Sequence, residues 1–125
     1  MSTSLTGKKV SDLRVLVVED EAAIAMLIED MLLDFDCTVV SIESKLSKAI
    51  EKAKDIDVDV AILDVNLAGE TSYPVADILK DRGIHIIFST GYGTSGLRAD
   101  FADTPVLQKP FVQKDLLNKL QQLID

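Results

Sequence analysis

The sequence predicts a single α/β domain, built as a doubly wound, five-stranded parallel sheet with helices on both faces. Five short segments are rich in β-branched residues and almost continuously apolar, which is typical of strands buried on both faces. Segments with helical spacing of apolar residues separate them, and this alternation predicts right-handed crossovers and the strand order 2-1-3-4-5. A chain of 125 residues also supplies one core without disulfides or a structural metal, since it buries roughly two-thirds of its unfolded surface.

The expected strands cover residues 15–18, 38–42, 58–63, 84–88 and 106–107. The first helix carries an apolar stripe, with acidic residues on its other faces, formed by Ile24, Leu27, Ile28, Met31, Leu32 and Phe35. The second helix has Ser44 as its expected N-cap and a stripe of Leu46, Ala49, Ile50 and Ala53. Pro74 suits the first turn of a third helix, and the spacing of leucines predicts a C-terminal helix over 116–124.

The segment from 91 to 104 departs from this regular pattern. Three of the six glycines lie in it, and only residues 97–101 have the composition of a helix. We therefore expect a short, mobile fourth helix. Residues 1–11 are expected to be a loose lead-in, and residues 12–125 to form the domain.

The net charge argues against nucleic-acid binding, and the short apolar stretches argue against a membrane span. There are 13 basic and 21 acidic residues, a formal net charge of −8, which disfavours binding of a phosphate backbone. The longest apolar stretches have about six residues, well under the ~18 that cross a bilayer. The N-terminus has no apolar segment after its lysines, so no secretory signal is expected and a cytoplasmic location follows by default.

Cysteine and histidine chemistry is also disfavoured. Cys37 and His85 are each the only residue of their type, so one chain cannot assemble a disulfide framework or a His/Cys zinc site. His85 lies in the apolar run of the fourth strand. We interpret it as a structural residue, hydrogen-bonded or at a strand end, rather than as the base of a nucleophile system.

Acidic residues follow the first and third predicted strands, which are neighbours in the middle of the sheet. Glu19, Asp20 and Asp64 should therefore meet at one edge, where they repel one another unless a cation lies between them. Oxygen ligands alone favour a hard ion such as Mg²⁺, with the backbone carbonyl of Asn66 completing its shell. This combination predicts a phosphoryl site with Asp64 as the nucleophile.

Two further strand ends supply the remaining groups of such a site. Lys109, after the fifth strand, would place a positive charge on the phosphoryl oxygens, and the Thr90 hydroxyl would donate a hydrogen bond to them. Each feature alone has an ordinary explanation, because acids cap helix N-termini and Asp and Lys-Pro are common in turns. Their occurrence together at four strand ends favours a single metal-assisted site.

These residues resemble the receiver domain of two-component response regulators over about residues 12–125. The matching segments are Val17-Val18-Glu19-Asp20-Glu21, Ile62-Leu63-Asp64-Val65-Asn66-Leu67 with Gly69, Ser89-Thr90-Gly91 and Lys109-Pro110-Phe111. The resemblance implies a flavodoxin-like fold, phosphorylation of Asp64 by a phosphohistidine, Mg²⁺ held by Glu19, Asp20 and Asn66, and a cis bond before Pro110. It also implies autodephosphorylation, so the chain is expected to be a phosphoacceptor rather than a metabolic enzyme, and a chain of this length is expected to have no output domain.

The segment Phe88-Ser89-Thr90-Gly91-Tyr92-Gly93 looks like a receiver subgroup with a Phe-Ala/Ser-Thr-Gly-Tyr-like motif, whose members often stand alone. Two positions depart from the family pattern. Glu19 replaces the commoner Asp and lengthens one metal arm, and Val106 replaces an aromatic residue whose ring moves inward on activation. Either Tyr92 takes over part of that role, or activation orders the segment 91–104 without a rotamer switch.

Several functions remain open at this point. The expected partners are a sensor histidine kinase or histidine phosphotransferase and an unknown downstream protein, with the chain acting as an effector, a relay intermediate or a phosphate sink. It is expected to be a monomer or a weak, phosphorylation-linked dimer. The alternative is an aspartyl-phosphate-forming small-molecule phosphatase, which usually has a second Asp where this sequence has Asn66. A flavin or nucleotide carrier would need a phosphate-binding loop after the first strand in place of three acids.

Overall fold

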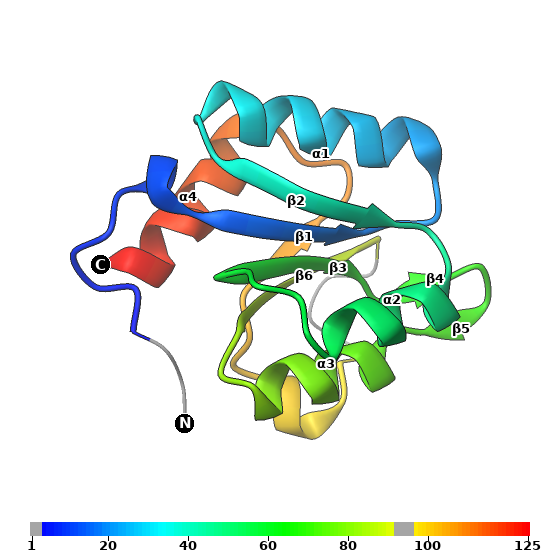
Figure 1. Ribbon diagram of the computed structural model, residues 1–125. Coiled ribbons are helices and arrows are strands. Elements are labelled where there is room, and N and C mark those ends of the chain that lie inside the picture. Colours follow the sequence, from blue (N-terminus) through cyan, green and yellow to red (C-terminus); the bar gives the residue numbers. More distant parts are fainter. Residues whose placement is uncertain (1–3, 92–96) are drawn as a thin grey trace.

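The computed structural model describes residues 4–91 and 97–125 and has a five-stranded parallel sheet at its centre (Figure 1). The strands are β1 (Arg14–Val18), β2 (Thr38–Glu43), β3 (Val60–Asp64), β6 (His85–Thr90) and β7 (Val106–Gln108). Their order in the sheet is β2-β1-β3-β6-β7. This is the predicted order 2-1-3-4-5, because β4 and β5 lie outside this sheet.

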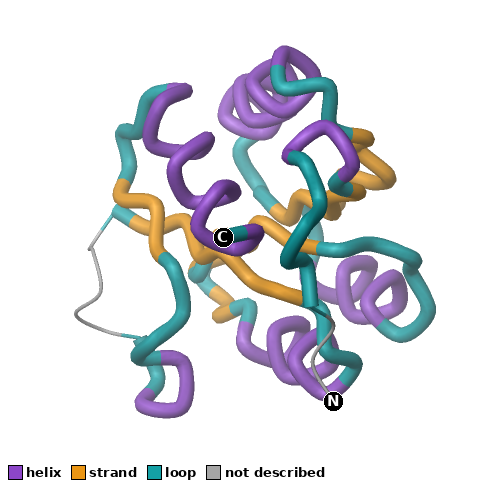
Figure 2. Tube along the Cα trace, turned by 90° about the vertical axis from the view of Figure 1, so that its left-hand side faces the viewer, coloured by secondary structure: helices purple, strands orange, loops and turns teal. Residues whose placement is uncertain are grey.

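Four α-helices cover the two faces of the sheet (Figures 1 and 2). They are α1 (Ala22–Asp34), α2 (Leu46–Ala53), α3 (Tyr73–Asp81) and α4 (Gln113–Ile124). Val15 and Val17 pack in one core cluster with residues of α1 and α4, whereas Leu16 and Val18 pack in a second with residues of α2 and α3. All five residues of β3 are buried, as the continuous apolarity of the segment predicted.

Two local predictions about the helices are wrong. The N-cap of α2 is Lys45 rather than Ser44, with no side-chain cap, so the helix begins one residue later than the Ser44 cap implied. Leu27 was placed on the apolar stripe of α1, yet it is 49% exposed. Met26 and Leu33 of the same helix are exposed as well. The buried face is narrower and centres on Ala25, Ile28, Met31 and Leu32.

The expected fourth helix is reduced to a single 3-10 turn, η2 (Ala99–Phe101). Its length agrees with a short element, but the turn is 3-10 rather than α-helical, and within it Phe101 is the buried residue. The C-terminal helix predicted as the fifth is α4. Tyr92, Gly93 and Gly96, which entered the predictions for this segment, lie outside the described residues.

A small hairpin of β4 (Asn66–Leu67) and β5 (Glu70–Thr71) follows β3 and was not predicted. Its turn residues Ala68 and Gly69 have φ angles of 51° and 90°, which is the backbone of the tight turns that join antiparallel strands. Glycine adopts this conformation without strain, and the side chain of Ala68 is small. The hairpin holds the chain next to the end of β3.

Part of the segment before β1, which was expected to be a loose lead-in, packs against the core. Leu5 is 1% exposed and lies in the same core cluster as Leu116 and Leu120 of α4. A 3-10 turn, η1 (Val10–Asp12), follows, and the Cys37 thiol donates to the carbonyl oxygen of Val10 at 3.3 Å. One leucine in a polar segment was too weak a periodic signal to predict this docking.

Two further expectations concern single elements. His85 is the first residue of β6, half-buried, which agrees with its interpretation as a strand-end residue. Across residues 4–91 and 97–125, none of the helices combines the length and the hydrophobicity that crossing a bilayer requires.

Replacing Leu5 with alanine is expected to destabilise the fold by about 2 to 4 kcal/mol, because the substitution leaves a cavity between the N-terminal segment and α4. Urea unfolding measures the effect. Thr6→Ala, at an exposed neighbour, is the control and should change stability by less than about 0.5 kcal/mol. Equal stability of Leu5→Ala and the wild type would show that the segment is not part of the core in solution.

Candidate functional site

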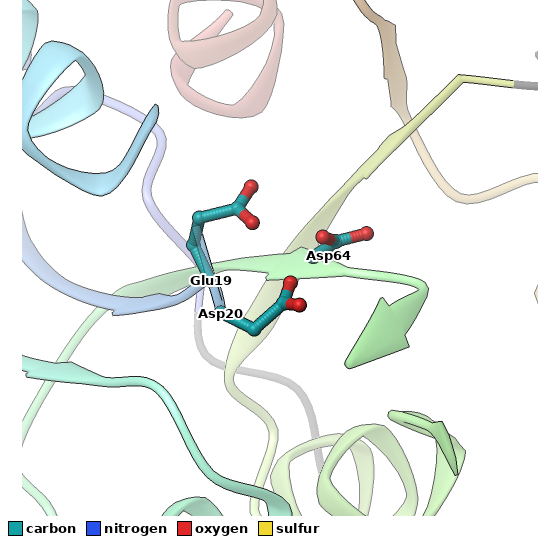
Figure 3. Close-up of side chains that lie close together, drawn as sticks. All are labelled: Glu19, Asp20 and Asp64. Carbon is teal, nitrogen blue, oxygen red and sulfur yellow. The ribbon is translucent and has the colours of Figure 1, made fainter. Parts of the chain in front are cut away.

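Three carboxylates meet at the carboxyl edge of the sheet (Figure 3). Glu19 and Asp20 follow β1, and Asp64 is the last residue of β3, whose register pairs Val18 with Leu63. One ligand atom of each carboxylate lies within 4.8 Å of the others. The predicted convergence of these side chains is therefore present in the fold, and it follows from the adjacency of β1 and β3.

Each carboxylate accepts one hydrogen bond from a backbone N–H. Glu19 Oε2 accepts from Glu21 at 3.1 Å, and Asp20 Oδ2 accepts from Ala68 at 3.2 Å. Asp64 Oδ1 accepts from Asn66 at 3.1 Å. These bonds orient the three carboxylates through the main chain.

Lys109 reaches the same edge from the end of β7, on the far side of β6. Its Nζ atom lies 2.8 Å from Glu19 Oε1 and 3.1 Å from Asp64 Oδ2. Its backbone N–H donates to the carbonyl oxygen of Thr90 at 2.8 Å, which joins the ends of β6 and β7. The Lys109–Pro110 bond is cis, as the family resemblance implied.

Burial and charge shift the proton affinities of this cluster. Desolvation raises the pKa of Glu19 to about 7, although hydrogen bonds from Lys109 and the backbone partly oppose the rise. For Lys109, desolvation lowers the pKa, but the hydrogen bonds to Glu19 and Asp64 outweigh it and the pKa is raised. Lys109 is therefore held in its charged form, and Glu19 titrates near neutrality.

The oxygen donors of the cluster fit a hard divalent cation. Glu19, Asp20 and Asp64 supply only carboxylate oxygens, which suits Mg²⁺ and not a soft metal. Asn66 is adjacent, with its side-chain oxygen bonded to the Gly69 N–H at 2.9 Å. Because this bond holds the side-chain oxygen in the hairpin turn, the backbone carbonyl is the oxygen of Asn66 that we expect to bind the cation, as predicted from the sequence.

A cavity of about 500 Å³ opens at this edge. It is lined by Asp20, Asp64, Asn66, Thr90, Gly91 and Lys109. Thr90 ends β6 and is 6% exposed. Glu19 is not among the lining residues, but its Oε1 atom accepts a hydrogen bond from Lys109, which is one of them. The fold thus brings every predicted site residue to one place, with room for a phosphoryl group.

The family model for "Response regulator receiver domain" matches residues 15–121. The chain belongs to this family. Receiver domains interact with kinases or phosphotransferases, and they bind Mg²⁺ at an acidic pocket, which here corresponds to Glu19, Asp20 and Asp64.

Solved structures agree with this assignment. SdrG from Sphingomonas melonis Fr1 is 41% identical, with a TM-score of 0.80 over 90% of this receiver domain and 97% of SdrG. The BeF3-activated conformation of SdrG, from Pseudomonas melonis Fr1, is 39% identical, with a TM-score of 0.78 over 94% and 99% of the two chains. The receiver domain of PhyR from Erythrobacter litoralis is 26% identical, with a TM-score of 0.78 over 90% and 89%. No curated protein matches the chain.

Sequence reasoning missed the backbone donors of this receiver site. The N–H groups of Glu21 and Ala68 hold two of the carboxylates, and main-chain groups carry no signature in residue type. A partial signal for the hairpin was present, because Gly69 occupies the second position of a two-residue turn between Leu67 and Glu70.

The raised pKa of Glu19 makes Mg²⁺ binding pH-dependent. Below pH 7 the folded, metal-free protein holds a proton on Glu19, and this proton must leave before the carboxylate binds a cation, so affinity should fall by up to about tenfold per pH unit. Calorimetric Mg²⁺ titrations between pH 5.5 and 8 measure this. Glu19→Gln should bind more weakly and lack the pH step, while Glu51→Gln, exposed on α2, should behave as the wild type. A pH-independent wild-type affinity would contradict the assignment.

Proposed function

We propose that this receiver domain accepts a phosphoryl group on Asp64 from a phosphohistidine of a sensor histidine kinase or histidine phosphotransferase. The observation that carries the proposal is the setting of the Asp64 carboxylate. Asp64 is the last residue of the buried strand β3. Its Oδ1 atom accepts a hydrogen bond from the Asn66 N–H, and its Oδ2 atom accepts one from Lys109 Nζ. Both Asp64 and Lys109 line the cavity together with Thr90.

The proposed transfer is a displacement at phosphorus. A carboxylate oxygen of Asp64 forms the new oxygen–phosphorus bond while the phosphorus–nitrogen bond breaks. The electron pair of the broken bond returns to the imidazole ring, which leaves neutral because its other nitrogen carries a proton. A carboxylate oxygen carries no proton that must be removed during the attack, so the step as written needs no general base.

The other residues of the cavity bind the transferred group. Lys109 Nζ is charged and adjacent to Asp64, so it attracts phosphoryl oxygens. Thr90 supplies a hydroxyl, which would donate to a phosphoryl oxygen. Glu19, Asp20, Asp64 and the Asn66 carbonyl would hold Mg²⁺, whose charge, when it is bound, offsets that of the phosphoryl oxygens.

Autodephosphorylation is part of the same proposal, so the domain acts as a phosphoacceptor and not as a metabolic enzyme. Membership of the receiver family and the amide at Asn66 both weigh against the small-molecule phosphatase alternative. SdrG adopts an activated conformation with BeF3, which supports the use of beryllofluoride as a phosphoryl mimic for this chain. The proposed output is a change in binding to a protein partner or onward transfer of the phosphoryl group.

Asp64→Asn should abolish phosphorylation, because an amide oxygen is a poor nucleophile and lacks the charge that Lys109 and Mg²⁺ stabilise. The measurement is incorporation of label from acetyl phosphate, or from a phosphorylated kinase, with Mg²⁺. Asp103→Asn, at an exposed aspartate, is the matched control and should label normally. Labelling of Asp64→Asn to the wild-type extent would refute the assignment of Asp64.

Thr90→Ala should still accept the phosphoryl group, since Asp64 and Lys109 are intact, but it should lose the response of the surrounding loops. Hydrogen exchange with and without beryllofluoride measures that response. Wild-type peptides within 88–111 should change protection on addition of the mimic, whereas those of Thr90→Ala should change little. An undiminished response in the variant would exclude Thr90 as the residue that senses the phosphoryl group.

A further inference from the structure

Arg98 ties the segment after β6 to helix α3. Its guanidinium donates to both carboxylate oxygens of Asp100, at 2.7 and 2.8 Å, and to both of Asp77, one of them at 3.2 Å. The group also lies over two rings, 5.0 Å from the centroid of Tyr73 and 5.1 Å from that of Phe101. We call Arg98 and these four partners the latch.

Two more contacts reinforce the latch. The backbone N–H of Arg98 donates to the Tyr73 hydroxyl at 2.9 Å, so the main chain as well as the side chain is held. Lys80 of α3 places its Nζ atom 5.0 Å from the centroid of Phe101 and 3.4 Å from the carbonyl oxygen of Asp100. In Figure 1, η2 accordingly lies against α3.

An isolated ion pair on a surface contributes little, so the ordinary explanation of the latch is a solvated contact. The geometry argues for more than that. Two carboxylates each accept two hydrogen bonds from one guanidinium, and two rings lie next to it. Several contacts share the ordering of one side chain, so less entropy is lost per contact. The pairing raises the pKa of Arg98 and lowers that of Asp100, so both charges are stabilised.

The latch is continuous with the phosphoryl site through an aromatic cluster. Phe88 contacts Tyr73 at 6.0 Å and Phe101 at 5.3 Å between ring centroids, both edge to face, and Tyr73 stacks on Phe101 at 5.8 Å. Phe88 precedes Thr90 by two residues on β6. Tyr73 follows the β4–β5 hairpin, where Ser72 N–H donates to Val65 O at 2.9 Å. The cluster therefore lies between two loops that line the cavity.

A phosphoryl group on Asp64 would change the surroundings of Lys109. Lys109 Nζ is bonded directly to Asp64 Oδ2, so a phosphoryl group attached to that oxygen would replace this bond. The backbone N–H of Lys109 donates to the carbonyl oxygen of Thr90, so a main-chain hydrogen bond joins the two residues that would contact the phosphoryl oxygens. Eight positions further along, Arg98 is fixed to α3.

We propose that the latch stabilises the resting arrangement of residues 97–101 and so opposes the rearrangement at Thr90 that the phosphoryl group requires. Arg98 is thus a positioning residue that sets how readily the site binds its phosphoryl group. A latch of this kind acts only through the difference in free energy between the two arrangements. This inference rests on the proposed function and adds the regulation of its site.

The test is the affinity for beryllofluoride in the presence of Mg²⁺, followed by NMR titration. Arg98→Ala should bind about tenfold tighter than the wild type, within the usual range of coupling between sites. Arg98→Lys, which keeps the charge but not the bidentate grip, should be intermediate. Asp77→Asn should tighten binding, whereas Asp81→Asn, an exposed carboxylate at the end of the same helix, should not.

Three further measurements separate the latch from a general loss of structure. Urea unfolding establishes that each variant is folded. Tyr73→Phe, which removes the hydrogen bond from the Arg98 N–H but keeps the ring, is the mildest probe and should tighten binding less than Arg98→Ala does. A destabilised site would bind the mimic more weakly, so tightening is specific to the latch. The difference between Arg98→Ala and the wild type should also shrink at high salt, which screens the ion pairs.

The outcomes distinguish the two proposals. Equal or weaker binding by Arg98→Ala, with normal binding by the wild type, would overturn the latch and leave the proposed function intact. Absence of binding by the wild type, or equal binding by Asp64→Asn, would overturn the proposed function itself. Additive effects of Arg98→Ala and Asp77→Ala in a double-mutant cycle would also count against the latch, because residues in direct contact are expected to be coupled.

Discussion

The contact of Lys109 with Glu19 and Asp64 is the interaction on which the site depends. The sheet order places β1 beside β3 and so brings three carboxylates together, two of them buried. Lys109 must extend past β6 to reach them, because β7 is the outermost strand. A buried charge left without its partner is strongly destabilising, so the lysine permits the acidic residues to lie where the fold puts them. The backbone bond from Lys109 to Thr90 then makes the end of β6 part of the same unit.

The three carboxylates still repel one another in this arrangement, and the repulsion favours binding of a cation. One lysine cannot neutralise three carboxylates, and the pKa of Glu19 is raised accordingly by its burial and by its neighbour Asp64. The metal-free site is thus poised to gain a cation. It is also poised to exchange the bond between Lys109 and Asp64 for bonds from Lys109 to phosphoryl oxygens.

The fold and the position of the site were predictable from sequence for a common reason. Strands that are continuously apolar must be covered by helices on both faces of the sheet. Functional polar residues are then expected at the strand ends, and Asp64, Thr90 and Lys109 were predicted there from their positions in the sequence. Features that depend on the backbone or on single contacts were not predictable. The Ala68 N–H has no signature in its residue type, and Leu5 docks alone from a polar segment. The residues 97–101 are held by Arg98 through tertiary contacts, so local helix propensity did not decide their structure.

The aromatic contacts of Phe88 lie with α3 and η2 rather than with β7. Val106 is the register partner of Phe88 on β7 and packs at the edge of the same core cluster. In place of an aromatic residue on β7, the rings that contact Phe88 come from α3 and η2, as Tyr73 and Phe101. Of the two alternatives drawn from the sequence, the one based on Tyr92 concerns a residue outside the described part of the chain. Under the latch proposed above, coupling would pass through Tyr73 and Phe101, because Arg98 lies over both rings and pairs with Asp77 of α3.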